Sequence, residues 1–366
     1  MTSIFRPTRA EVRLSAVRKN LQKIKVAAGP ARVLFVVKAN AYGHGAAALA
    51  GLAEREKLAW GFGVSSVEEG LALRSAGIKN PVLVLGSLYP FESFVEAINA
   101  GLTVTIASLD AARQVKEAAA KLGKKAVCHI KLETGMGRIG ARKPSVLKIY
   151  DELSGSGDVS VEGMYTHLSS ADCDPEYTGL QLSIFGETAA GLEDRGARGL
   201  VLHAANSGAA LKCPVSRMDM VRCGIAAYGL ADGFEPALAL KSRIVFVKNV
   251  REGAFISYDK SFRAGRPMKI ATIPAGYGDG YLRRFSNRAD ILVGGRRCRV
   301  LGNVTMDMVM ADVTAVKEAA VGSEAVLLGR QGGQEITAQE LAGLADTITY
   351  EIVTLISARV PRVYVE

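Results

Sequence analysis

Apolar residues in the first two thirds of the chain form short runs that alternate with longer segments of helical spacing. Eight runs rich in β-forming residues lie at residues 33–37, 60–64, 82–85, 103–106, 126–132, 159–165, 200–203 and 218–222. Apolar positions three or four residues apart predict helices between most of them, at residues 46–57, 66–77, 91–99, 110–122, 144–153, 180–192 and near Ala209. Strands that alternate with helices favour parallel pairing through βαβ units.

Eight such units within about 230 residues match the length of a TIM-like (β/α)8 barrel. A doubly wound sheet is the competing α/β architecture. No Gly-x-Gly-x-x-Gly turn follows the first run, which counts against the dinucleotide-binding form of that sheet. A further helix is predicted before the barrel, because residues 8–11 (Thr-Arg-Ala-Glu) have a capping-box pattern and apolar positions follow at Leu14, Val17, Leu21 and Ile24.

After about Gly233 the helical spacing gives way to short alternating runs. They lie at residues 242–250, 268–273, 290–292, 297–301, 309–313 and 325–328, and one helix, capped at Thr337, interrupts them. This pattern predicts a β-rich second domain. We therefore expect an α/β barrel domain at residues 6–233 and a β-rich domain at residues 234–366, with residues 1–5 as a candidate extra strand.

The amino-acid composition narrows the class of protein and leaves the predicted fold unchanged. Of 366 residues, 49% are hydrophobic and 22% are charged, which is ordinary for a globular enzyme. The net charge of +10 is scattered along the chain, so we expect no nucleic-acid partner. Five cysteines without a Cys-x-x-Cys pair indicate reduced thiols and no metal site. We find neither a signal peptide nor an apolar stretch of ~20 residues, and expect a cytoplasmic protein without a membrane partner.

Candidate catalytic groups lie where the predicted strands end, because the working residues of a barrel lie at that end. Lys38 ends the first strand, where burial would lower the pKa of its ammonium and make it a usable nucleophile or base. Ser207 opens a short helix and Gly224 permits close backbone approach, so both are candidate phosphate ligands. A Schiff-base lysine, a phosphate pocket and a histidine able to stack on a ring, His167, together indicate pyridoxal 5′-phosphate.

Each of these residues also has a plainer interpretation when it is taken alone. Lys38 could reach solvent from an ordinary strand end, Ser207 could cap a helix, Gly224 could form a turn, and His167 could be a satisfied polar core residue. Their joint placement at one end of the predicted barrel favours the cofactor site.

The motifs around these residues resemble those of the alanine racemase family, whose members are pyridoxal-phosphate enzymes of fold type III. Residues 36–45 (Val-Val-Lys-Ala-Asn-Ala-Tyr-Gly-His-Gly) resemble the family's cofactor-binding signature. Further matching motifs follow in the expected order at residues 131–138, 165–167, 205–207, 221–225, 256–258, 276–280, 306–307 and 350–351. The resemblance spans nearly the whole chain. It implies the interconversion of L-alanine and D-alanine, which supplies D-alanine for bacterial cell-wall peptidoglycan.

The resemblance implies that Lys38 holds the cofactor and then serves as one of two bases, with Tyr258 on the opposite face. A tyrosine with an ordinary pKa of ~10 is a poor base near neutrality, and His167 and Arg222 would lie in the network that tunes it. Arg222 would face the pyridine nitrogen and, because an arginine only donates hydrogen bonds, leave it unprotonated. The residues implied to bind the cofactor are Lys38, Tyr42, His167, Asn206, Ser207, Arg222, Gly224, Ile225 and Tyr350.

The resemblance also implies substrate contacts and an assembly. Arg138 and the N–H of Met306 would bind the substrate carboxylate, and Tyr277 would lie at the entrance. Lys131 matches a position that is often carbamylated. Because Tyr258 and Met306 reach into the site of the other subunit in this family, a homodimer with shared active sites is implied.

Departures from the family pattern, and other enzymes on the same barrel, leave alternatives open. Asp259 follows Tyr258 where many relatives have a small residue, and Thr305 precedes Met306 where others have cysteine or serine. Both positions bear on substrate breadth. A decarboxylase of basic amino acids would need an acidic residue at the position of Arg222, and a non-catalytic carrier of the cofactor would consist of the barrel alone. A broad-specificity racemase is a further alternative, although exported members carry a signal peptide.

Overall fold

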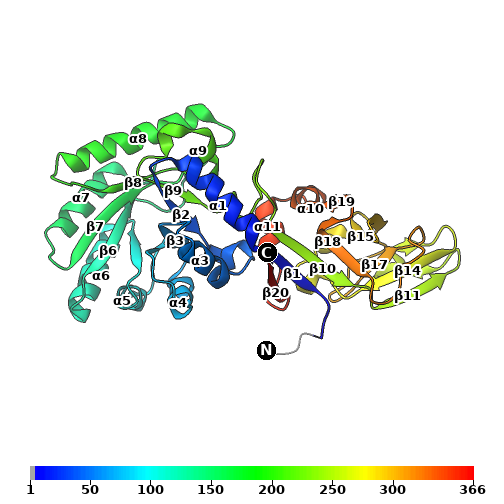
Figure 1. The fold of residues 1–366 in the computed structure, drawn as a ribbon. Coiled ribbons are helices and arrows are strands. Elements are labelled where there is room, and N and C mark those ends of the chain that lie inside the picture. The colour runs from blue at the N-terminus through cyan, green and yellow to red at the C-terminus, as the bar shows by residue number, and fades with distance from the viewer. Residues whose placement is uncertain (1–4) are drawn as a thin grey trace. The chain divides into compact units, whose positions relative to one another are not determined.

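The computed structural model describes residues 5–366, and their contacts divide the chain into two compact units (Figure 1). The barrel unit comprises Arg18–Ala41 and Gly45–Ala227, and the β-rich unit comprises Met1–Val17, Tyr42–His44 and Tyr228–Glu366. Most of the extra strand predicted at residues 1–5 lies outside the described residues, and Phe5 is in no strand. The predicted domain boundary between residues 233 and 234 stays a prediction.

Eight parallel strands form the barrel sheet. They are β2 (Arg32–Val36), β3 (Gly61–Val64), β4 (Val82–Val84), β5 (Thr103–Ile106), β6 (Ala126–Lys131), β7 (Val159–Tyr165), β8 (Val201–His203) and β9 (Met220–Cys223). Paired neighbours follow the order β8-β7-β6-β5-β4-β3-β2-β9. The Asp219 N–H donates to the Leu202 carbonyl (3.1 Å) and the Arg222 N–H to the Ala205 carbonyl (2.9 Å), which joins the two ends of this order. The predicted barrel is confirmed, and the doubly wound alternative is wrong.

Helices cover the outside of the barrel, as Figure 1 shows for α4 to α8. The barrel helices are α3 (Ala46–Arg55), α4 (Val67–Ser75), α5 (Phe91–Asn99), α6 (Leu109–Leu122), α7 (Lys143–Ser154), α8 (Pro175–Glu193) and α9 (Ser207–Lys212). Each long helix buries one apolar face; α7, for example, buries Val146, Ile149 and Leu153, three or four residues apart. Helix spacing in the sequence therefore located these elements to within a few residues, least well at the start of α8.

Three sheets make up the β-rich unit. Their order is β16-β15-β18-β10-β1-β20, with β19 on β18, then β11-β14-β17, then the hairpin β12-β13. The strands are β1 (Arg9–Arg13), β10 (Leu238–Arg243), β11 (Phe246–Val250), β12 (Phe255–Ile256), β13 (Phe262–Arg263), β14 (Met268–Ile273), β15 (Asp290–Val293), β16 (Arg296–Arg299), β17 (Val309–Asp312), β18 (Glu324–Gln331), β19 (Gln334–Ile336) and β20 (Arg362–Val365). The predicted β-rich character is confirmed.

The helix predicted from Thr8 is wrong at its start, because β1 occupies those residues. Ala10 and Val12 are fully buried between more exposed neighbours, an alternation of period two that suits a strand. The Thr8 hydroxyl donates to the Pro274 carbonyl (2.5 Å) instead of capping a helix. The helix itself, α1 (Leu14–Ala28), begins only after β1.

Two further predictions for the second half of the chain are wrong. Residues 242–250, predicted as one run, contain the end of β10 and all of β11, because β10 pairs with β18 whereas β11 pairs with β14. A second helix, α11 (Thr349–Thr354), follows α10 (Ala338–Ala345). Six residues are too few to reveal a helical period. The predicted cap of α10 is confirmed, since Thr337 accepts from the Glu340 N–H (3.0 Å).

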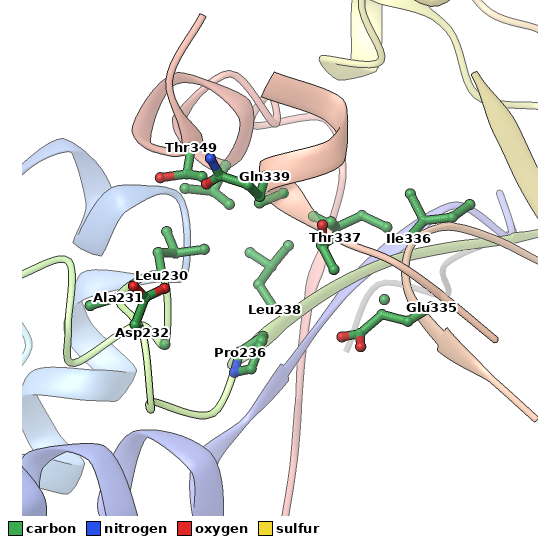
Figure 2. Close-up of a pocket in the computed structure, with 15 residues that line it drawn as sticks. Leu230, Ala231, Asp232, Pro236, Leu238, Glu335, Ile336, Thr337, Gln339 and Thr349 are labelled. Carbon is green, nitrogen blue, oxygen red and sulfur yellow. The ribbon is translucent and has the colours of Figure 1, made fainter. Parts of the chain in front are cut away.

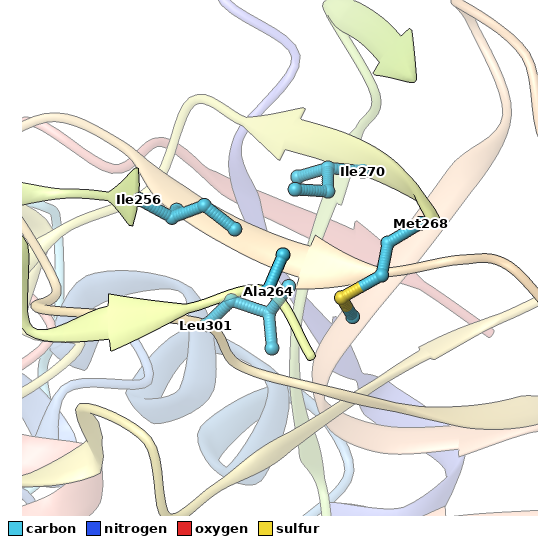
Figure 3. Packing of buried hydrophobic residues seen from close by; sticks show 5 residues of the cluster. All are labelled: Ile256, Ala264, Met268, Ile270 and Leu301. Atoms are coloured by element: carbon cyan, nitrogen blue, oxygen red, sulfur yellow. The ribbon is translucent and has the colours of Figure 1, made fainter. Parts of the chain in front are cut away.

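A small apolar core supports the hairpin β12-β13, whose connecting loop contains Tyr258. Figure 3 shows its five buried side chains, which come from β12, β14 and nearby loops: Ile256, Ala264, Met268, Ile270 and Leu301. A short 3-10 helix, η2 (Tyr258–Lys260), comes two residues after β12. The backbone of Tyr258 is therefore tied to a packed core even though its side chain is 68% exposed.

Candidate active site

Lys38 begins a turn of left-handed backbone just after β2. The three residues that follow it, 39–41, have φ angles of 50°, 51° and 54°, and this turn forms α2 (Lys38–Tyr42). For L-residues a left-handed helical conformation costs about 1–2 kcal/mol per residue, so contacts elsewhere must stabilise the turn. One of them comes from α4, where the Glu69 carboxylate accepts a hydrogen bond from the Ala39 N–H (2.6 Å). Glu69 was not predicted as a site residue, because nothing in its local sequence indicates a contact thirty residues away.

The charges around Lys38 favour its neutral amine. Burial lowers the pKa of Lys38, the cationic Arg138 lowers it further, and the Glu69 carboxylate opposes both. A lysine with a lowered pKa is a better nucleophile and base near neutrality than a solvated one. The position and the environment of Lys38 therefore both suit covalent chemistry.

Arg222 is a buried cation whose donors are almost all used by the barrel. Its guanidinium donates to the carbonyls of Thr166 (2.7 Å), Ala204 (3.0 Å) and His203 (3.0 Å). It also lies 3.2 Å from Nδ1 of His203 and 3.4 Å from Nδ1 of His167. Burial lowers the pKa of Arg222 to about 10, so the group stays charged at neutral pH. Held by five contacts, it is a fixed hydrogen-bond donor at this end of the barrel.

Both histidines beside Arg222 are neutral. Burial lowers the pKa of His167 to about 3, and Arg222 adds to the effect. Burial, His129 and Arg222 hold the pKa of His203 well below its ordinary value. Because Arg222 can only donate, Nδ1 of each histidine accepts.

Because Nδ1 of His203 accepts, its proton lies on Nε2, and this tautomer extends the polar network into the barrel. Its Nε2–H points to Nδ1 of His129 (2.8 Å), and Nε2 of His129 lies 3.3 Å from the Glu162 carboxylate. The hydrogen bond from His129 lowers the pKa of Glu162. His203, His129 and Glu162 were not predicted as site residues from the sequence. The signal that could have identified them is a polar residue within an otherwise apolar strand.

Lys131 and Arg138 lie near Lys38 and Arg222. Burial lowers the pKa of Lys131 to about 8, with Arg138 and Arg222 adding to the effect, and its ammonium lies 5.4 Å from the centre of the Tyr165 ring. The turn before Arg138 is fixed by Glu133, which accepts from the N–H groups of Gly135 (2.5 Å) and Gly137 (3.0 Å). Mutual effects on pKa place Lys38, Lys131, Arg138, His167 and Arg222 in one electrostatic cluster.

Backbone donors converge on Ser207 at the start of α9. Asn206 caps this helix by accepting from the Ala209 N–H (3.0 Å). The Ser207 hydroxyl lies 3.1 Å from the Gly224 N and 3.5 Å from the Ala226 N, on either side of Ile225. A hydroxyl and neighbouring backbone N–H groups are the donor set that holds a phosphate, so these residues fit the phosphate of the predicted cofactor.

The other predicted residues belong to the β-rich unit. The rings of Tyr42 and Tyr350 lie 5.9 Å apart. Burial raises the pKa of Tyr42, and Tyr350 raises it further, so Tyr42 stays a neutral hydrogen-bond donor. Tyr258, Tyr277 and Met306 are 68%, 42% and 53% exposed. The structure thus gathers the lysines, arginines and His167 in the barrel unit and presents Tyr258, Tyr277 and Met306 on the surface of the β-rich unit.

The β-rich unit also contains a cavity of about 190 Å³ that none of the predicted residues lines (Figure 2). Its walls are mostly apolar and include Leu230, Leu238, Ile336 and Val353. Within residues 5–366, no group of three or more His, Cys, Asp or Glu side chains is arranged to hold a metal ion. No helix in this range has the length and hydropathy needed to cross a membrane.

A closed (β/α)8 barrel with a lysine after its first strand, joined to a β-rich unit, defines a two-domain barrel enzyme. The model of the alanine racemase N-terminal domain matches residues 12–232, and that of the C-terminal domain matches residues 237–364. The chain therefore belongs to the alanine racemase family and is an isomerase.

Relatives and solved structures agree with this assignment. The alanine racemase of Symbiobacterium thermophilum is 47% identical over 98% of this chain and 97% of its own length. The alanine racemase of Clostridium difficile 630 has a TM-score of 0.94 at 36% identity, covering 100% of this chain and 97% of that one. The Bacillus anthracis enzyme, solved with bound L-Ala-P, has a TM-score of 0.94 at 34% identity, covering 100% and 96%.

Proposed function

We propose that this protein is a pyridoxal-phosphate-dependent alanine racemase that interconverts L-alanine and D-alanine. The observation that carries the proposal is the cluster at one end of the barrel, where Lys38 of lowered pKa lies within electrostatic range of Arg138 and His167. Membership of the alanine racemase family supports the same reaction.

The residues that we propose to bind pyridoxal phosphate can interact with its aldehyde, its ring or its phosphate. When bound, this group withdraws electrons from an amino acid joined to its aldehyde and so acidifies the α C–H bond. Lys38 supplies the amine that holds the aldehyde. Arg222 would donate to the pyridine nitrogen, and His167 would contact the ring. Tyr42, Ser207, Gly224, Ile225 and Tyr350 would hold the phosphate, and Asn206 is a further cofactor-binding residue.

Two bases on opposite faces of the substrate move the α-proton. Lys38 is one base and Tyr258 is the other, since a racemase must remove a proton from one face and return one to the other. The lowered pKa of Lys38 supports its role. Tyr258 lies on the surface of the β-rich unit, as expected of a group that acts in the site of a second subunit.

A homodimer with two shared active sites follows from this assignment. Its support is the exposure of several large apolar and aromatic residues of the β-rich unit, among them Phe255, Tyr258, Tyr277 and Met306. Arg138 and the N–H of Met306 bind the substrate carboxylate, and Tyr277 lines the entrance. Carbamylation of Lys131 would place an anion beside Arg138; the lowered pKa of Lys131 favours the neutral amine that this reaction needs.

The cellular role that we propose is the supply of D-alanine for bacterial cell-wall peptidoglycan, in the cytoplasm. Racemisation yields either enantiomer, so the reaction itself does not fix the direction of use.

The experiment that tests the proposed function is incubation of the yellow holoenzyme with a panel of L-amino acids in deuterated water. We expect L-alanine to lose its α-proton and become racemic. Release of carbon dioxide from a basic amino acid would instead show a decarboxylase. Equal racemisation of many amino acids would show a broad-specificity racemase.

A further inference from the structure

The loop that carries Met306 is fixed by a neighbouring glycine-rich turn of the β-rich unit. This turn, at residues 276–280, contains the 3-10 helix η3 (Tyr277–Asp279). The Tyr277 N–H donates to the Thr305 carbonyl (3.0 Å), and the Gly278 N–H donates to the Met306 carbonyl (2.9 Å). Two consecutive carbonyls of the Met306 loop therefore point at the turn.

The first of these hydrogen bonds decides where the Met306 N–H points. In a trans peptide the N–H is opposed to the C=O of the same unit. Because the Thr305 carbonyl is held by the turn, the Met306 N–H faces away from it. Within residues 5–366 this N–H has no hydrogen-bond partner, and the Met306 side chain is 53% exposed. The loop thus presents one unpaired backbone donor.

Arg359 ties the turn to the part of the loop that follows this donor. Its Nε donates to the carboxylate of Asp279 (2.7 Å), and its Nη2 donates to the Met306 carbonyl (3.3 Å) and to Asp307 (2.8 Å). Asp279 is fully buried and also accepts from Arg6 (2.7 Å) and from the Gly276 N–H (2.9 Å). The guanidinium thus bridges a buried carboxylate and the exposed loop.

The close approach of turn and loop requires glycine at residue 276. A Cβ atom there would lie 2.2 Å from the Thr305 oxygen and 2.5 Å from the Met306 oxygen. Both contacts are with backbone, which cannot rotate away. Any side chain at this position must push the loop outward.

We propose that Gly276 and Arg359 are positioning residues, which aim the Met306 N–H at the carboxylate of the substrate. They touch neither substrate nor cofactor. This inference rests on the proposed function, in which Met306 binds that carboxylate.

The test compares Gly276→Ala with Gly265→Ala, a control of the same unit where an added Cβ meets nothing within 4 Å. In Gly276→Ala the KM for alanine is expected to rise about 10-fold, as for the weakening of one hydrogen bond to a charged group. The kcat is expected to change little, because the carboxylate is bound equally in ground and transition states. The value of kcat/KM must fall by the same factor for L-alanine and D-alanine, because the two enantiomers have equal free energies and their equilibrium constant is one. Gly265→Ala should match the wild type.

A second pair keeps the test independent of how Gly276→Ala folds. Arg359→Ala is compared with Arg330→Ala, which removes only the exposed ion pair with Glu335. Calorimetric titration with acetate, an unreactive carboxylate, measures the affinity for a carboxylate in the absence of turnover. Weaker acetate binding and a raised KM in Arg359→Ala alone would support the inference, and values equal to the wild type would overturn it. A wild-type enzyme that does not racemise alanine would contradict the proposed function, whereas the acetate titration would still decide the role of Arg359.

Discussion

At the scale of single residues, Arg222 is a permanent cation whose two histidine neighbours are neutral. Arg222 is fully buried and held by carbonyls, and it donates to His203 and His167. A second proton on either histidine would place two positive charges in contact inside the barrel. The histidines therefore stay neutral, and each offers a lone pair to Arg222.

This arrangement predicts that the protein loses stability in mild acid. Below pH ~6.5 an unfolded histidine binds a proton, while His203 in the folded protein does not. Protons then favour the unfolded state, so stability falls as the pH drops, by at most about 1.4 kcal/mol per pH unit for each such histidine. Urea unfolding of wild type and His203→Asn between pH 7 and pH 5 measures this slope. The variant should show a shallower slope, and parallel curves would contradict the prediction.

At the scale of elements, the left-handed turn after β2 is the part of the site that most needs support. Glu69 accepts from the Ala39 N–H (2.6 Å), the Ser65 N–H (2.7 Å) and the Ser65 hydroxyl (2.9 Å). One carboxylate therefore joins the Lys38 turn to the loop after β3. Because Glu69 lies on helix α4 of the barrel, its hydrogen bonds hold the Lys38 turn to a rigid element.

Replacement of Glu69 by Gln should loosen this turn. A glutamine amide has one oxygen and one NH2, so a donor would meet a donor at one of the three contacts. We expect a loss of about 1 kcal/mol in the free energy of unfolding, the net contribution of a typical hydrogen bond, and weaker retention of the yellow colour on dialysis. Glu68→Gln, one residue away, is the matched control. Equal colour retention in both variants would argue against the role of Glu69.

Elements and candidate residues were predictable from the sequence to different degrees. The barrel strands were predicted to within two residues because their apolar runs are dense and bounded by polar turns. β1 was missed because residues 8–11 fit both a capping box and an alternating strand. Glu69 carries no local signal, since it contributes through a contact thirty residues away. Tertiary contacts, rather than propensity, decide such roles.

At the scale of the whole molecule, the two proposed bases lie in different compact units, Lys38 in one and Tyr258 in the other. In the proposed homodimer each active site takes Lys38 from one subunit and Tyr258 from its partner. A mixed dimer of two defective subunits would then contain one site with both defects and one intact site.

This assembly predicts that two inactive variants restore activity when they are combined. Lys38→Ala and Tyr258→Phe should each be nearly inactive alone. After co-expression in equal amounts, half of the dimers are mixed and half of their sites are intact. We expect about a quarter of wild-type activity per subunit, if assembly is random and the subunits are independent. No recovery in mixed dimers, with their formation verified by two affinity tags, would contradict shared sites.

The most direct test of the two-base mechanism is α-proton exchange in the Tyr258→Phe holoenzyme, followed by NMR in deuterated water. We predict that the protein keeps its yellow absorption near ~420 nm, because Lys38 still holds the cofactor. Exchange of the L-alanine α-proton and racemisation in both directions should fall about 100-fold or more, the usual contribution of a general base. Racemisation that continued in both directions at the wild-type rate would contradict the assignment of Tyr258 as the second base.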